Sequence, residues 1–200
     1  MTSLTMRRRR GRWALLAVAL AGCGFLSPKA DPTRFYVLTA VADAPAPPRG
    51  LAVGLGPIVL PSYLQRPELA LRVGPNEVRF REFDRWAGSL PAQVGSVLGE
   101  NLRRVLGADR VVLFPWYSGT KLDLVVELQV FRFEPDHDGL AHLLGHWRLR
   151  DAAHATDLTA ADVDLSETVA SRDPDGEVAA LSRLLAQLAR QIADAAPPGR

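Results

Sequence analysis

A strict alternation of apolar and polar residues in the second half of the chain most restricts the fold. Within the segment from Leu122 to Glu134, every second position is apolar for the first five: Leu122, Leu124, Val126, Leu128 and Val130. Successive side chains of a β-strand point to opposite faces, so this pattern predicts a long strand with one buried face. The turn from Asp136 to Gly139 and the run from Leu140 to Arg150 predict its hairpin partner, whose buried face carries Leu143, Trp147 and Leu149.

Shorter runs of β-branched and aromatic residues predict further strands at 34–40, 51–60, 69–73, 77–83, 110–114 and 158–169. Two segments instead carry apolar residues at helical spacing. The first begins at Ser89, a good N-cap, and ends at Gly107. The second begins at Asp173-Pro174, and its apolar stripe is Val178, Leu181, Leu184, Leu185, Leu188 and Ile192. This order predicts an α+β fold, a mainly antiparallel sheet with two helices packed on one face.

The N-terminus has the three-part layout of a secretory signal. Five arginines precede an apolar run from Trp13 to Ala21, and small residues lead to Cys23. A bilayer core takes about 20 apolar residues, so this run predicts secretion rather than a permanent transmembrane helix. Leu20-Ala21-Gly22-Cys23 resembles a bacterial lipobox, which implies a diacylglycerol and an N-acyl chain on Cys23. The alternative is an incidental thiol in an ordinary signal peptide.

These features predict a signal peptide at 1–22, a lipidated tether at 23–33, one domain at 34–196 and a frayed tail at 197–200. The single cysteine excludes a disulfide within the chain, a multi-cysteine zinc site and an iron–sulfur cluster. Without the five N-terminal arginines, 19 basic residues face 22 acidic ones. A mildly acidic body gives no electrostatic footprint for nucleic acid.

The chain shows no arrangement typical of catalysis. No GxSxG motif marks a nucleophilic serine, and no glycine loop suits a phosphate. His142 and His146 have the spacing of a zinc pair on a helix, but on a strand four residues separate them by about 13 Å. We therefore interpret both as solvated strand residues and expect no metal, no cofactor beyond the acyl chains on Cys23, and no enzyme activity.

Aromatic residues outside the periodic segments are the candidate binding residues. Prolines at both ends of the segment from Pro61 to Pro67 predict a stiff loop that presents Tyr63, Leu64 and Arg66. We expect Tyr63 and Arg66 to contact a partner and to contribute little to stability. Trp86 and Trp116 follow strands, and the sequence leaves open whether they bind a partner or belong to the core.

Several motifs in order resemble the PqiC-type ABC transport auxiliary lipoproteins. They are GPIVLPSYLQRPEL from Gly56, REFDRWAGSL from Arg81, ENLRRVLGADRVVLFPW from Glu100 and LVVELQVFRFE from Leu124. The resemblance covers nearly all of the chain from Phe35 to the last helix.

The resemblance implies an outer-membrane lipoprotein, anchored on the periplasmic face, that works with an MCE-domain protein and often an ABC permease and ATPase to move lipid between membranes. Self-association into a homo-oligomer is compatible with this role. Gly24 after the lipobox cysteine also favours the outer membrane. Two alternatives stay open: a lipid-anchored protein that itself binds a small apolar ligand, and a periplasmic hydrolase.

Overall fold

The computed structural model describes residues 30–42 and 45–197. The predicted signal peptide, Cys23 and most of the tether lie outside the described residues, as does the end of the tail. Residues 33–200 form one compact unit, which contains the fold. Its elements in chain order are β1 (Arg34–Tyr36), β2 (Ala52–Val59), η2 (Ser62–Gln65), β3 (Glu68–Gly74), β4 (Glu77–Trp86), α2 (Leu90–Leu106), β5 (Arg110–Leu113), β6 (Leu124–Pro135), β7 (Leu140–Asp151), β8 (Thr156–Thr168) and α3 (Pro174–Asp194).

The strands form two sheets. The smaller has the order β1-β4-β3, and the larger has the order β5-β2-β6-β7-β8. Both are mixed, because β1 is parallel to β4 and β2 is parallel to both β5 and β6, whereas the remaining pairs are antiparallel. The predicted α+β fold is confirmed; the strands form two mixed sheets rather than one, and the longest ladders, β6–β7 and β7–β8, are antiparallel. Parallel neighbours need a long crossover, and β3, β4 and α2 supply it between β2 and β5.

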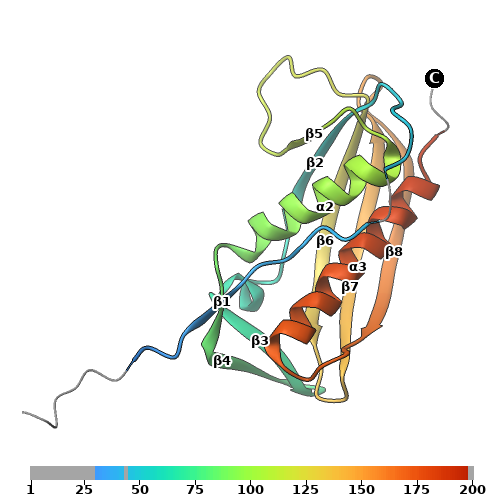
Figure 1. Ribbon diagram of the computed structural model, residues 1–200. Helices are drawn as coiled ribbons and strands as arrows, with labels where there is room; N and C mark the ends of the chain where they lie inside the picture. Colours follow the sequence, from blue (N-terminus) through green and yellow to red (C-terminus); the bar gives the residue numbers. More distant parts are fainter. Residues whose placement is uncertain (1–29, 43–44, 198–200) are drawn as a thin grey trace, which may run out of the picture. The chain divides into compact units, whose positions relative to one another are not determined.

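Both helices cover the same face of the five-stranded sheet, as predicted (Figure 1). Helix α2 contacts β2 and β5, and α3 contacts β6, β7 and β8. Gly107 ends α2 in the left-handed conformation, and a Cβ there would lie 2.0 Å from the Pro47 carbonyl oxygen. At the start of α3, the Asp173 side chain accepts a hydrogen bond from the Gly176 N–H at 2.8 Å.

The core lies between this sheet face and the helices. The alternating residues of β6 from Leu124 to Val130 are buried, as are Leu143, Trp147 and Leu149 on β7. Every residue of the predicted α3 stripe is also buried. Among the described residues, the buried apolar side chains of this core run from Leu38 to Ile192.

The segment after β1 differs from the prediction. The sequence predicts a strand through Ala40, but β1 ends at Tyr36 and the chain continues as a segment from Val37 to Ala42, here called the strap. Helix side chains bind its backbone: the N–H groups of Leu38, Thr39 and Ala42 donate at 2.9–3.1 Å to Gln93, Ser182 and Asn101. Figure 1 shows the strap running along α2 and α3. Side chains of α2 and α3 thus accept the hydrogen bonds that the strap backbone would otherwise donate to a neighbouring strand.

Candidate partner-binding surfaces

The loop from Pro61 to Pro67 contains a short 3-10 turn, η2. Leu64 points from this turn into the core with 3% of its surface exposed, and its N–H donates to the Pro61 carbonyl at 3.0 Å. Trp86 is 6% exposed, and its N–H donates to the Pro67 carbonyl at 2.7 Å. Leu64 and Trp86 are therefore core residues that hold the loop on the domain, which for Trp86 is the core alternative that the sequence left open. Partner binding by these two residues stays a prediction.

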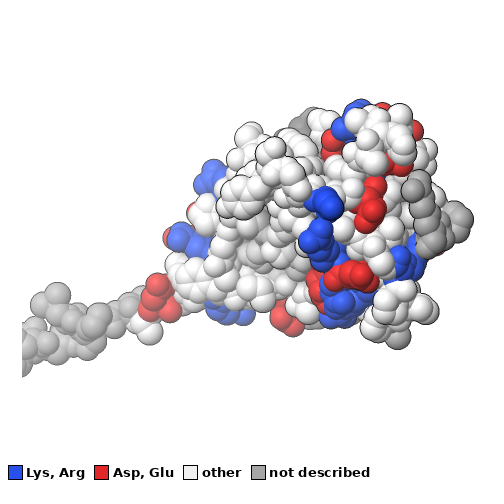
Figure 2. All heavy atoms as spheres, turned by 90° about the horizontal axis from the view of Figure 1, so that it is seen from above, with Lys and Arg blue, Asp and Glu red and all other residues white. Residues whose placement is uncertain are grey.

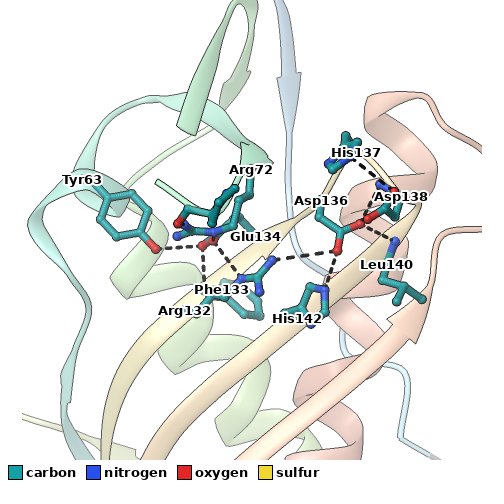
Figure 3. Close-up of polar contacts among 11 residues, drawn as sticks. Tyr63, Arg72, Arg132, Phe133, Glu134, Asp136, His137, Asp138, Leu140 and His142 are labelled. Carbon is teal, nitrogen blue, oxygen red and sulfur yellow. Dashed lines mark hydrogen bonds and ion pairs between the residues drawn. The ribbon is translucent and has the colours of Figure 1, made fainter. Parts of the chain in front are cut away.

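Tyr63 points toward a buried carboxylate. Its hydroxyl donates to Glu134 Oε2 at 2.9 Å, and Glu134 is only 1% exposed (Figure 3). Arg72 Nε and Arg132 Nε donate to Glu134 Oε1 at 2.7 and 3.1 Å. We call Tyr63, Arg72, Arg132 and Glu134 the Glu134 cluster. It joins η2, β3 and β6, which are distant in sequence.

The charges of the Glu134 cluster are consistent with Tyr63 as the donor. Burial and the neighbouring Glu134 carboxylate raise the pKa of Tyr63 to about 12, so the hydroxyl stays protonated and donates. A buried carboxylate needs a compensating charge, and the two guanidinium groups supply it. The Glu134 cluster thus gives Tyr63 a structural contact that a local reading of the loop does not reveal. Partner binding by Tyr63 stays a prediction.

The two histidines contact different carboxylates. His142 Nε2 lies 2.7 Å from Asp136 Oδ2 (Figure 3), whereas His146 Nδ1 lies 2.8 Å from Asp162 Oδ1. Burial opposes ionisation of Asp136, but hydrogen bonds from the Leu140 N–H and from His142 outweigh it and lower its pKa. Within the described ranges, no three His, Cys, Asp or Glu side chains are grouped to hold a metal ion.

Arg66 remains on the surface. Its Cζ lies 4.4 Å from the centroid of the Phe80 ring, and its Nε lies 3.3 Å from Glu68 Oε2. More than half of the Arg66 side chain, 55%, is exposed. A guanidinium held over a ring is partly ordered before binding, which lowers the entropic cost of a contact.

Trp116 lies in the β5–β6 connection, away from η2 and the small sheet (Figure 1). It is half-buried against Gly54 and meets Phe114 edge-on, with ring centroids 5.2 Å apart. Phe114 is 53% and Tyr117 90% exposed, so the surface here consists more of these two aromatics than of Trp116. Sequence reasoning did not select them, although the run from Phe114 to Tyr117 lacks the alternation of a buried strand.

The five predicted partner-binding residues therefore form no single site. Tyr63, Leu64 and Arg66 lie on or beside η2 next to Trp86, and two of these four are core residues.

A separate open groove of about 390 Å³ runs between the strap and α3, where Val37, Val41 and Ala186 meet Arg183 and Arg190. None of the helices in the described part of the chain has the length and apolar character needed to cross a bilayer.

Comparison with known proteins places this α+β domain in a class of transport lipoproteins. A family model described as "ABC-type transport auxiliary lipoprotein component" matches residues 36–193. The chain belongs to this family, which confirms the resemblance seen in the sequence.

Solved structures show the same fold. An uncharacterized protein superposes with a TM-score of 0.66 at 20% identity, over 81% of this chain and 97% of that one. Protein XCC0632 from Xanthomonas campestris, of family DUF330, superposes with a TM-score of 0.63 at 16% identity, over 80% of this chain and 92% of that one. No curated protein matches the chain.

Proposed function

We propose that this protein is an outer-membrane lipoprotein on the periplasmic face and a non-catalytic docking subunit of an MCE-type lipid transport system that supports envelope integrity. The family match over residues 36–193 carries the proposal, because the family is an auxiliary lipoprotein component of ABC-type transport. The lipobox that ends at Cys23 supports an anchor on the bilayer. An exposed, ring-supported Arg66 and the aromatic β5–β6 connection supply surface for a protein partner.

The anchor is tested by replacing its acceptor. We expect the wild-type protein to incorporate radioactive palmitate and to sediment with membranes, whereas Cys23→Ala does neither, because the thiol accepts the diacylglycerol. A variant that still takes up label and stays with the membrane contradicts the anchor.

The docking role is tested by capture from detergent-solubilised membranes, with bound proteins identified by mass spectrometry. We expect an MCE-domain protein with its ABC permease and ATPase, and a lower yield with Arg66→Ala. Arg79→Ala is the matched control, because Arg79 is 69% exposed and also pairs with a glutamate two residues away. Capture without any transporter component contradicts the proposal, and equal losses in both variants place the interface elsewhere.

The strap groove favours one alternative function, direct binding of a small apolar ligand. Its volume of about 390 Å³ falls in the range of ligand pockets, about 300–1,000 Å³. Ala179→Trp, at an exposed position of the groove lining, would fill it. If lipid that co-purifies with the wild-type protein is lost from this variant, the alternative gains support; unchanged co-purification removes it.

A further inference from the structure

Two phenylalanines of the small sheet point away from the core. Phe35 on β1 is 66% exposed and Phe83 on β4 is 45% exposed. Phe35 is paired with Arg85, and Phe83 precedes Arg85 by two residues, so strand alternation puts all three on one face. Single exposed apolar residues are ordinary, but two aromatics from neighbouring strands on the same face form a patch that can bind.

The orientation of this face is fixed by the opposite one. Asp84 is buried, and it accepts a hydrogen bond from the Tyr36 hydroxyl at 3.1 Å and an ion pair from Arg34 at 2.8 Å. Trp86, two residues further on, is buried as well. Because alternate residues of β1 and β4 are held in this way, Phe35 and Phe83 cannot turn inward without breaking these contacts.

Arg85 lies beside the two rings, and Arg66 lies close to Arg85 because both contact Glu68. Arg66 and Arg85 approach Glu68 at 3.3 and 3.7 Å and keep 55% and 41% of their side chains exposed. Arg34, the neighbour of Phe35 in sequence, instead points to the opposite face, where it pairs with Asp84. Figure 2 shows basic and acidic side chains interspersed on the face that it draws. Aromatic rings flanked by guanidinium groups are typical of the membrane–water interface, where rings enter the acyl boundary and guanidinium groups reach phosphates.

The covalent path to the proposed anchor brings a bilayer within reach of this face. Only 12 residues separate Cys23 from Phe35. At about 3.3–3.6 Å per residue, Phe35 stays within about 43 Å of Cys23 however the tether is arranged. β1 is the first element after the tether, whereas the acidic strand β8, with Asp157, Asp162 and Asp164, lies at the other side of the domain (Figure 1).

We propose that the face formed by Phe35, Phe83 and Arg85 rests on the phospholipid surface in which Cys23 is anchored. The inference depends on the proposed lipid anchor and adds to it a second, non-covalent contact. Such a contact turns a flexibly tethered domain into an oriented one, with the β5–β6 connection facing away from the bilayer.

The test places a fluorophore sensitive to polarity, NBD, on single engineered cysteines in the lipidated protein. Phe35→Cys and Phe83→Cys report on the proposed face, and Tyr117→Cys is the control, because Tyr117 is an aromatic residue 90% exposed on the β5–β6 connection. The proteins are reconstituted into vesicles of phosphatidylcholine with phosphatidylglycerol, without any other protein. We expect emission at positions 35 and 83 to rise about twofold, to shift to the blue and to be quenched by spin-labelled lipid, while position 117 is unchanged.

Equal, water-like emission at all three positions overturns the inference. Failure of the anchor is a separate result, in which the chain does not float with vesicles. In that case residues 24–200, which include the whole core, are held by an N-terminal hexahistidine tag on a nickel-chelating lipid. The same three probes then decide whether the face meets the bilayer.

Discussion

Replacing Tyr63 by phenylalanine separates a structural role of this residue from partner binding. The substitution keeps the ring and removes only the hydroxyl that donates to Glu134 at 2.9 Å. A hydrogen bond to a charged group contributes about 1.5–3 kcal/mol. Glu134 Oε2 still accepts from the Phe133 N–H at 3.1 Å, so the carboxylate is not left unpaired and the lower end of the range applies.

We expect Tyr63→Phe to lower the free energy of unfolding by about 1.5 kcal/mol. For a domain of this size the melting temperature then falls by about 3–6 °C. The measurement is equilibrium urea unfolding of residues 31–200, followed by far-ultraviolet circular dichroism; the midpoint should fall at constant slope, because no surface burial changes.

Tyr117→Phe is the matched control, because that tyrosine is 90% exposed, and its unfolding free energy should change by less than about 0.5 kcal/mol. If the two variants unfold at the same urea concentration, the Tyr63–Glu134 hydrogen bond does not stabilise the domain. If Tyr63→Phe is also as stable as wild type but captures less partner, Tyr63 is a contact residue.

Two further perturbations test the burial and the electrostatics. Leu64→Ala should lower the free energy of unfolding by about 2–5 kcal/mol, because Leu64 is 3% exposed. A loss below about 0.5 kcal/mol would show that Leu64 is a surface residue. Hydrogen bonds from Arg103 and then Arg104 lower the pKa of Glu100 from 4.5 to about 2. Because the pKa of Glu100 is lower in the folded state, its carboxylate stabilises the domain above pH 4.5, and this stability is lost as the pH falls toward 2. Between pH 4.5 and 2, the urea midpoint of Glu100→Gln should therefore fall less steeply than that of wild type. Parallel curves for the two proteins would contradict the assignment.

Local patterns in the sequence predicted the elements and the faces that they bury. The alternation from Leu122 to Val130 and the stripe from Val178 to Ile192 each need only a few neighbouring residues to define a buried face. The turn at Asp136 to Gly139 and the end of α2 at Gly107 are local for the same reason. The α+β class and the family resemblance follow from the order of these elements.

Which elements of the domain contact one another was decided only in the tertiary structure. Tyr63 and Glu134 are 71 residues apart, and no local period records that η2 lies against β6. The strap illustrates the same limit: its sequence is strand-like, but it pairs with Gln93, Ser182 and Asn101, the second of them 143 residues from its partner Thr39. The local sequence around Leu64 and Trp86 resembles that of exposed loop residues, and only packing against distant segments buries their side chains.

The sequence by itself thus determined which faces are apolar, because periodicity is a property of the local backbone. The tertiary structure decided which apolar faces meet, which strands run parallel and which polar side chains compensate Glu134. These outcomes depend on long-range packing and on the desolvation of charges, and both take effect only when distant segments bury one another.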